Sequence, residues 1–469
     1  MRGVPGSSPG LPIGPFRVCG GREWAAFPAP GGGGPTQSLR MNALDVAYAL
    51  AAAVTAPWWA RKARGGWRER LGHIAALSAP EVGRPRVLLH GVSVGEVSAL
   101  RGLVPMLRER ADVVVCASTD TGLARARELY GPVLGEGRVV RYPLDASASV
   151  RRFLDAVRPD VVGLVELEVW PNFVAECRRR GIPIGVINGR LSPRSFRGYR
   201  RIRPLLRRTF ASLAVAAVQD EAYAKRFRAM GVPAERVRVT GSMKWDAAPV
   251  ADHVPGAEEL AREMGIDLER PLVVAGSTAP GEDALLHAAC PKGVQLMCAP
   301  RKPEWFDGAF RALGGEKACT RRSIARGEGA VQRGAFGALV EKRDRFLLDT
   351  IGELRKAYAL ADVVVVGRTF EDYGGSDPIE PAALGKPVIV GPHVGNFLSV
   401  VKAFDDAGGI VRTTRAGLAG ELAALLADRP RRDALAARAR ECIAAQQGAT
   451  ARHAQILLDL AAARVSPSA

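Results

Sequence analysis

The stretch that decides the fold is Arg86–Val97, which reads RVLLHGVSVGEV. It begins with a short run of Val and Leu, passes through a turn containing two glycines, and leads into apolar residues at helical spacing, namely Leu100, Val104 and Leu107. The first run shows no alternation of apolar and polar residues, so it predicts a strand buried on both faces. A strand, a glycine-rich turn and a helix in this order indicate a parallel sheet covered by helices.

The same pattern recurs along the chain in two sets of runs. These are RVLLH, DVVVCAS, DVVGLVE and IPIGVIN in the first set, and PLVVAGS, VQLMCAP, DVVVVG and KPVIVGP in the second. A stretch without apolar periodicity, residues 245–259, separates the two sets. The fold class predicted is therefore α/β, with two Rossmann-like doubly wound domains joined by a linker near residue 246. Ligands of such sheets bind beyond the carboxyl ends of the strands, in this case where the two domains face each other.

The N-terminal region has two different compositions. Residues 1–40 are rich in Gly and Pro and are predicted to be a low-complexity tail. Residues 46–60 are apolar, end in Trp58 and Trp59, and run into a basic flank, which is typical of a membrane anchor with its positive side in the cytoplasm. A buried or amphipathic helix is the alternative, because Asp45, Thr55 and Pro57 interrupt the segment.

Composition narrows the classes of partner. Ordinary apolar and charged fractions in 469 residues exclude a disordered chain, collagen and a multi-span membrane protein. The formal net charge of +18 indicates an anionic partner: a phosphorylated substrate, a phospholipid surface or nucleic acid. The sequence contains no recognised nucleic-acid-binding module, and we predict no nucleic-acid partner.

The turn after the first predicted strand contains two candidate reactive groups. Glu96 would lie at the mouth of the site as a general base, on a turn whose glycines let a substrate approach the backbone. The same letters also fit a Gly-x-Ser-x-Gly nucleophile elbow with Ser93 as the nucleophile, although that elbow normally follows several strands. A third interpretation makes Glu96 a first-turn residue that complements the helix dipole.

Two further groups of polar residues follow the next strands of the first set. Glu166 and Glu168 end one strand, and two carboxylates two residues apart on extended chain are expected to point the same way. The following strand ends at Asn188, and an arginine-rich segment begins at Arg190 and Arg194. This segment is either a grip for phosphate groups or a solvated basic helix face.

Small-residue turns recur after the strands of the second set, and each could leave backbone N–H groups free to bind an anion. Their recurrence predicts a nucleotide-binding half opposite an acceptor-binding half. No Walker A motif and no metal-ligand spacing is present. The residues singled out in these turns are Lys244, Ser277, Arg301, Gly352, Glu353, Leu354, Asp377 and Glu380.

Taken together, these motifs resemble those of the bacterial 3-deoxy-D-manno-octulosonic acid (Kdo) transferases of lipopolysaccharide assembly. The resemblance runs from about Met41 to about Thr450, with the motifs in the same order. It rests on HGVSVGEV, VELEVWPNF, NGRLSPRSFRGY, GSMKWD, AGSTAPGED, PRKPEWF, DTIGEL with AYALADVVVVG, and GGSDPIEPAALGKPVIVGP.

The resemblance implies a GT-B glycosyltransferase that needs no cofactor or metal. It implies CMP-Kdo as donor and a lipid A precursor as acceptor, at the cytoplasmic face of the inner membrane with its anionic lipid. By motif, Glu96 is the implied base. Arg301, Gly352, Glu353, Leu354 and Glu380 are implied by motif to bind the donor. Lys244, Ser277 and Asp377 are predicted to bind it with them, and Glu380 is predicted to hold the ribose. Ser93, Glu166, Glu168, Asn188, Arg190 and Arg194 are predicted to bind the acceptor.

The implied domain plan places an apolar anchor helix with its basic flank at 41–70 and an acceptor-binding domain at 71–245. A linker follows at 246–259, and then a CMP-sugar-binding domain at 260–430. The plan ends with C-terminal helices at 431–469, which are expected to pack back on the first domain. The family's usual Gly-Gly-His-Asn reads Gly374-Gly375-Ser376-Asp377 here, which adds a negative charge near the expected phosphate site. Another GT-B enzyme, with a UDP donor or epimerase activity, is the alternative function.

Overall fold

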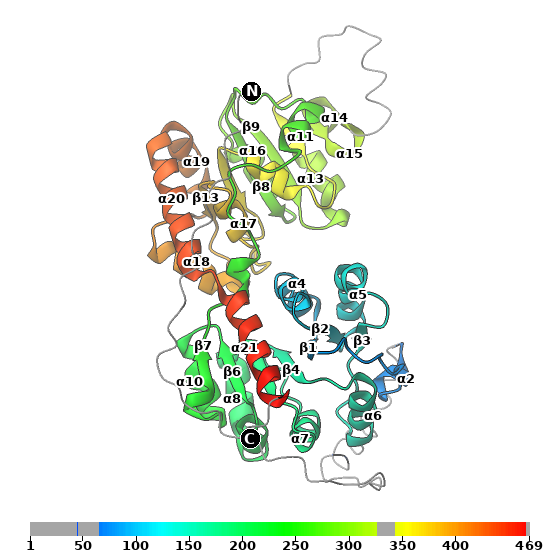
Figure 1. Ribbon diagram of the computed structural model, residues 1–469. Coiled ribbons are helices and arrows are strands. Elements are labelled where there is room, and N and C mark those ends of the chain that lie inside the picture. Colours follow the sequence, from blue (N-terminus) through cyan, green and yellow to red (C-terminus); the bar gives the residue numbers. More distant parts are fainter. Residues whose placement is uncertain (1–44, 46–64, 326–342, 466–469) are drawn as a thin grey trace, which may run out of the picture.

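A computed structural model of the chain describes Asp45 and residues 65–325 and 343–465. It has two domains, one above the other in Figure 1, and each is built on a seven-stranded parallel sheet. The strand orders are β3-β2-β1-β4-β5-β6-β7 and β10-β11-β9-β8-β12-β13-β14. Both orders reverse direction in the middle, between β1 and β4 and between β8 and β12, which confirms two doubly wound domains.

The strands of the first sheet are the apolar runs predicted from the sequence, with three further short ones. They are β1 (Arg86–Gly91), β2 (Asp112–Ala117), β3 (Val139–Arg141), β4 (Val161–Val165), β5 (Ile184–Gly189), β6 (Val215–Val218) and β7 (Val237–Val239). The helices of this domain are α2 (Trp67–Arg70), α3 (Val94–Ala99), α4 (Leu103–Arg108), α5 (Asp120–Leu134), α6 (Ser147–Val157), α7 (Pro171–Arg179), α8 (Pro193–Arg201), α9 (Arg203–Ala211) and α10 (Glu221–Met230).

The second sheet is built in the same way. Its strands are β8 (Leu272–Thr278), β9 (Gln295–Pro300), β10 (Cys319–Arg321), β11 (Arg345–Leu347), β12 (Val363–Val366), β13 (Val388–Val390) and β14 (Val411–Arg412). Its helices are α11 (Ala257–Met264), α12 (Glu282–Ala289), α13 (Phe306–Ala312), α14 (Gly315–Ala318), α15 (Arg322–Ala325), α16 (Leu354–Leu360), α17 (Ile379–Ala383), α18 (Leu398–Asp406), α19 (Leu418–Ala427) and α20 (Arg429–Gln446). Helix α21 (Ala449–Val465) ends the described chain.

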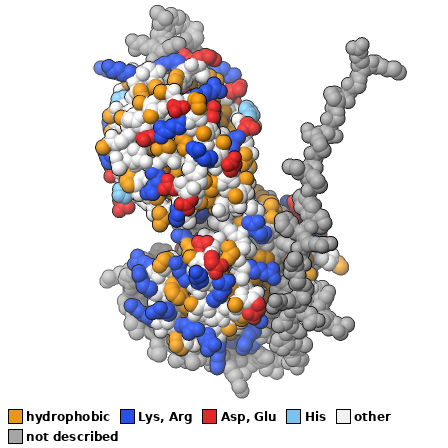
Figure 2. Space-filling view, turned by 90° about the vertical axis from the view of Figure 1, so that its left-hand side faces the viewer, with side chains coloured by type: hydrophobic (Ala, Val, Ile, Leu, Met, Phe, Trp, Pro, Cys, Tyr) orange, Lys and Arg blue, Asp and Glu red, His pale blue; other side chains and the backbone are white. Residues whose placement is uncertain are grey.

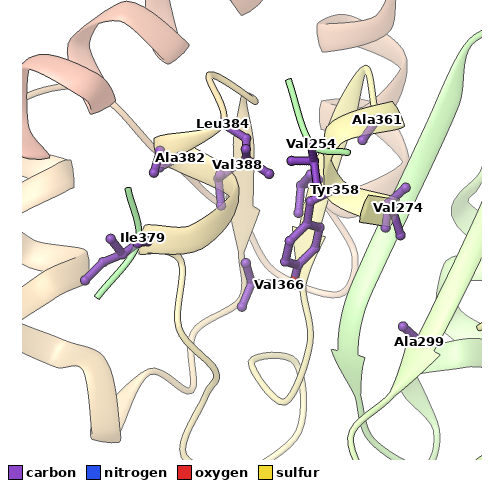
Figure 3. Packing of buried hydrophobic residues seen from close by; sticks show 14 of the residues in the cluster. Val254, Val274, Ala299, Tyr358, Ala361, Val366, Ile379, Ala382, Leu384 and Val388 are labelled. Atoms are coloured by element: carbon purple, nitrogen blue, oxygen red, sulfur yellow. The ribbon is translucent and has the colours of Figure 1, made fainter. Parts of the chain in front are cut away.

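Each sheet is buried on both faces, as the unbroken apolar runs predicted. In β1, Leu88 packs into one apolar cluster, whereas Val87 and Leu89 pack into the cluster on the opposite face. Figure 3 shows part of one cluster of the second domain, where Tyr358 of α16 lies with Val274 of β8 and Val366 of β12. Alternate residues of a strand point to opposite faces, so double burial needs apolar residues at every position.

The chain crosses between the domains twice, and both crossings differ from the predicted boundaries. Met243 belongs to the first core, while Trp245 and Ala248 belong to the second, so the first crossing lies at Lys244 and not in a linker at 246–259. Helix α20 packs on α17, α18 and α19 of the second domain. Only α21 returns to the first domain, where it packs on α4, β4 and β5 (Figure 1). The predicted return of the whole segment 431–469 is therefore wrong for α20.

The two crossings are bonded to each other by Asp246. Its carboxylate accepts hydrogen bonds from the N–H groups of Gly448 at 2.7 Å and Thr450 at 2.6 Å. Gln447 Nε2 also donates to the carbonyl of Trp245 at 3.2 Å. Asp246 thus caps α21 from the opposite crossing segment, and the two connections form one unit.

Most of the predicted anchor segment lies outside the described residues, since 46–64 are not described. Asp45 is buried and accepts hydrogen bonds from the Ser147 N–H and from Asn172 Nδ2. Arg70, in the predicted basic flank, is buried and paired with Asp120 at 3.0 Å, so it is not available to a lipid headgroup. Among the described residues, none forms a helix long and apolar enough to cross a bilayer.

Candidate active site between the two domains

The turn after β1 holds Glu96 by both of its carboxylate oxygens. The Val92 N–H donates to Oε2 at 2.8 Å, and the Ser93 hydroxyl donates to Oε1 at 2.9 Å. Ser93 is the N-cap of α3, and its Oγ in turn accepts from the Glu96 N–H. This exchange resembles a capping box, which orients the carboxylate at the carboxyl end of β1. The Ser93 hydroxyl is engaged by a carboxylate, whereas a nucleophile elbow would engage it with a general base such as histidine.

Glu166 and Glu168 follow β4, the strand next to β1 in the sheet. The chain here is a turn and not extended, since Glu166 has φ 58°, so the expected alignment of the two side chains on an extended strand is wrong. Glu166 Oε2 lies 4.0 Å from Arg190 Nη1. Glu168 accepts a hydrogen bond from Trp170 Nε1 at 3.0 Å. The turn therefore gives the two carboxylates different partners.

The negative charge of Glu96 nevertheless affects the pKa values of both Glu166 and Glu168. Burial raises the pKa of Glu168 to about 7, with further contributions from the negative charges of Glu96 and Glu166. Burial also raises the pKa of Glu166, where Arg190 opposes the shift and Glu96 adds to it. The charge of Glu96 therefore contributes to the electrostatic environment of both carboxylates, and all three residues follow β1 and β4, the neighbouring strands of the first sheet at its switch point.

Asn188 lies near the end of β5, the strand next to β4. It is 1% exposed and has φ 51°, and its N–H donates to His453 Nε2 of α21 at 3.2 Å. Its Oδ1 accepts from the Met243 N–H at 3.2 Å. Its Oδ1 is thus used inside the protein, while its Nδ2 has no partner among the described residues, and its contact with an acceptor stays a prediction. Arg194 lies exposed on α8, away from any ion pair with a described residue.

Lys244 stands at the first crossing, between the domains. Its Nζ lies 5.0 Å from the centre of the Phe397 ring of the second domain. Burial and the positive charge of Arg190 lower the pKa of Lys244, while Asp377 and Glu166 oppose the shift. Lys244 thus interacts with charges from both domains, and its role in donor binding stays a prediction.

The second-domain wall of the site carries Asp377 and Glu380. Asp377 Oδ1 accepts a hydrogen bond from the Ile379 N–H at 2.9 Å. Burial raises the pKa of this carboxyl to about 6, although that hydrogen bond and the positive charge of Lys244 both act to lower it. Glu380 Oε1 lies 3.8 Å from Arg355 Nη1. Burial raises the pKa of Glu380, and the charges of Arg355 and of Arg101 in the first domain oppose the shift. Sequence reasoning missed both arginines, since no motif marks them.

The other predicted donor residues line the ends of neighbouring strands of the second sheet. Ser277 has φ 57° at the end of β8, and the Arg301 N–H after β9 donates to the Thr278 carbonyl at 3.0 Å. Gly352 is exposed with φ 93°, just before α16. The Glu353 side chain is turned inward, where both of its oxygens accept from Arg322. Only its backbone remains for a ligand, while Leu354 begins α16.

We define the interdomain site as Glu96, Glu166, Glu168, Arg190, Lys244, Asp377 and Glu380. Several of these residues follow strands near the switch points of the two sheets, where doubly wound sheets bind their ligands. Solved structures share this two-domain fold. A putative UDP-N-acetylglucosamine 2-epimerase from Listeria monocytogenes matches 82% of this chain and 98% of its own with a TM-score of 0.52 at 14% identity. Acinetobacter baumannii MurG matches 80% and 99% with a TM-score of 0.50 at 13% identity.

Sequence comparison gives the family. A profile described as 3-deoxy-D-manno-octulosonic-acid transferase (kdotransferase) matches residues 65–247, and one described as glycosyl transferases group 1 matches residues 339–442. The 3-deoxy-D-manno-octulosonic acid transferase of Bordetella pertussis is 34% identical over 85% of this chain and 94% of its own length. That of Haemophilus influenzae is 30% identical over 84% and 90%.

The chain therefore belongs to the Kdo transferase family, as its motifs predicted, and it is a glycosyltransferase. Within the part of the chain that the structure describes, no three His, Cys, Asp or Glu side chains are grouped so as to hold a metal ion.

Proposed function

We propose that this protein transfers Kdo from CMP-Kdo to a lipid A precursor, lipid IVA, in lipopolysaccharide biosynthesis. Its relatives of similar length carry the name of this transferase. The observation that carries the proposal is the position of Glu96, whose carboxylate is held by two hydrogen bonds after β1, the strand next to the one that leads into Glu166 and Glu168. A base at this edge faces the domain that is proposed to hold the donor.

In the proposed reaction, Glu96 removes the proton from a primary hydroxyl of the acceptor sugar. That oxygen attacks the anomeric carbon of Kdo, the bond from this carbon to the phosphate oxygen breaks, and CMP leaves with the electron pair. Attack opposite to the leaving group inverts the anomeric configuration. Each Glu96 oxygen keeps a lone pair beyond the one that accepts its hydrogen bond, so the carboxylate can accept the proton where it stands.

Donor binding is assigned to groups of the second domain and the crossing. Lys244 and Arg301 would neutralise the phosphate, with the N–H groups of residues 352–354, and Glu380 would accept the ribose hydroxyls. Ser277 lies at the adjacent strand end. Because the Glu353 carboxylate is bound to Arg322, its contribution is a backbone N–H. No metal is assigned a role, and retention of activity after EDTA dialysis is the expected result.

A basic face with two apolar residues supports an anionic membrane surface as the site of action. Helix α8 buries no residue, and the segment from α8 through α9 exposes Ile202 (47%) and Leu205 (74%). Seven exposed arginines surround them, none in an ion pair with a described residue: Arg194, Arg197, Arg200, Arg201, Arg203, Arg207 and Arg208. Figure 2 shows Lys and Arg gathered on the lobe that the first domain forms. Arginines attract anionic headgroups, and apolar tips enter the interface.

The membrane proposal is tested with vesicles that contain anionic lipid. Leu205→Glu is expected to weaken binding several-fold, while Leu268→Glu, at a 56% exposed position of the second domain, leaves it unchanged. Equal binding by both variants would place the membrane contact elsewhere.

The reaction is tested by incubating the protein with CMP-Kdo and tetraacylated lipid A precursor, followed by mass spectrometry of the lipid. A mass gain by whole Kdo units is expected, and NMR of the product reports its anomeric configuration. A melting-temperature increase with CMP but not with UDP would support the donor, because a ligand stabilises the folded state to which it binds. The opposite preference would favour a UDP-sugar enzyme.

A further inference from the structure

Glu282, the first residue of α12, is 0% exposed, and its carboxylate binds the backbone of two different turns. Oε2 accepts hydrogen bonds from the N–H groups of Ala279 at 2.9 Å and Arg368 at 2.6 Å, and Oε1 accepts from the Phe370 N–H at 2.9 Å. Ala279 belongs to the turn after β8, whereas Arg368 and Phe370 belong to the turn after β12. Because a buried carboxylate needs such donors, Glu282 holds the two turns together.

These two turns lie at the switch point of the second sheet. Strands β8 and β12 are neighbours at the place where the strand order reverses, and ligands of such sheets bind there. The backbones are in close contact, since a Cβ on Gly367 would lie 2.5 Å from the Cα of Thr278. Ser277 ends β8, and the turn after β12 leads to Glu380. Glu282 itself is buried, so its effect on a ligand must pass through these turns.

The turn after β12 needs support from outside to keep its shape. Arg368 has φ 61°, a left-handed conformation that is unfavourable for a residue with a side chain. Such a conformation persists only where the surroundings fix it. The N–H groups of Arg368 and Phe370 bind Glu282, while the Oγ1 of Thr369 between them accepts from the Gly391 N–H after β13 at 2.9 Å. The turn is thus held on both sides, and Glu282 holds it on the side of β8.

The conformation of Arg368 affects the loop that leads to α17. The Arg368 carbonyl accepts a hydrogen bond from the Gly375 N–H at 2.8 Å, and its Nη2 donates to the Tyr373 carbonyl at 2.7 Å. These bonds close the loop, and the first turn of α17 contains Glu380, which is proposed to bind the ribose. A shift of Arg368 would therefore displace the loop that positions Glu380.

We propose that Glu282 is a positioning residue of the donor site, because its carboxylate fixes the turn after β12 against the turn after β8 in the conformation that the donor nucleotide requires. The inference rests on the proposed function, which assigns the nucleotide to the second domain. Glu282→Gln is the smallest change that tests it. The amide has one accepting oxygen, and its NH₂ group would face at least one of the three N–H groups, so at least one hydrogen bond is lost.

The test compares transfer kinetics, calorimetric CMP binding and thermal melting of full-length variants. A hydrogen bond to a charged group is worth about 10- to 100-fold in an equilibrium constant. Glu282→Gln should therefore raise the donor KM and the CMP dissociation constant about tenfold, with the acceptor KM within about twofold of wild type. Asp362→Ala is the matched control, because Asp362 Oδ2 accepts from the Leu272 N–H at 2.9 Å and joins the opposite ends of the same two strands. It should lower the melting temperature and leave the donor KM unchanged.

A donor KM that rises equally in both variants, or in neither, would overturn the inference. Arg368→Gly provides a second background, because glycine adopts φ 61° without strain and the turn then needs less support. In this background Glu282→Gln should raise the CMP dissociation constant by less than about threefold, and an undiminished tenfold rise would also overturn the inference. No CMP binding by the wild type would contradict the proposed donor, and the same comparison with UDP would then decide the role of Glu282.

Discussion

Replacement of Glu96 by glutamine tests the proposed base with little disturbance of the fold. Glutamine has nearly the same shape, and its amide oxygen can still accept one of the two hydrogen bonds that hold the Glu96 carboxylate. The bond that is lost belongs to the N-terminal cap of α3, and caps contribute about 1 kcal/mol to the free energy of unfolding. Stability should therefore fall slightly, whereas an alanine at this position would lose both bonds.

The expected catalytic loss is much larger. General base catalysis contributes about 10²- to 10⁴-fold, equivalent to about 3–5 kcal/mol of the activation free energy. Glu96→Gln should lower kcat by this factor and leave the dissociation constant of CMP within about twofold, because the donor groups lie on the other domain. Removing the negative charge should also lower the pKa of Glu168 from about 7, since Glu96 contributes to raising it.

The assay is the rate of Kdo transfer to the lipid acceptor, measured beside calorimetric binding of CMP and thermal melting. Glu109→Gln is the control, because Glu109 is exposed at the end of α4 in the same domain. A Glu96→Gln enzyme that keeps kcat within tenfold of wild type would refute the assignment of the base. Loss of CMP binding along with activity would instead mean that Glu96 acts on donor binding.

Three further predictions concern stability. Asp246→Ala removes the side-chain cap that joins α21 to the first crossing. Urea denaturation should show a loss of about 1–2 kcal/mol in the free energy of unfolding, and no loss would mean that the cap is redundant. Gly276→Ala should lower the melting temperature by several degrees, because its Cβ would lie 1.9 Å from the Tyr358 hydroxyl; an unchanged melting temperature would contradict this packing. Burial and Arg452 lower the pKa of His453 from 6.5 to about 4, so the unfolded state binds a proton that the folded state rejects. Stability should fall as pH drops from 6.5 to 4, and less so in His453→Gln; equal pH profiles would refute this cause.

Much of the fold could be predicted from the sequence because its signals are local. Runs such as DVVVCAS and DVVVVG indicate strands buried on both faces wherever they lie, and the small-residue turns after them follow from the geometry of strand ends. The motif order was specific enough to give the family, which sequence comparison confirmed. Domain boundaries were less accurate, because the packing of Trp245 and of α20 depends on which core is nearer, and no local signal records this.

The candidate site was predictable as a set of residues but not as an arrangement. The sequence by itself determined that Glu96, Glu166 and Glu168 follow buried strands, since apolar runs precede them. The tertiary structure showed that these two strands are neighbours in the sheet. Only the tertiary structure decided that Asn188 is buried against α21 and that the Glu353 carboxylate is bound to Arg322. It also decided that Lys244 lies between the charges of two domains. The physical reason is range: secondary structure and turns arise from contacts within a few residues, whereas burial and electrostatic environment arise from segments brought together from far apart in the chain.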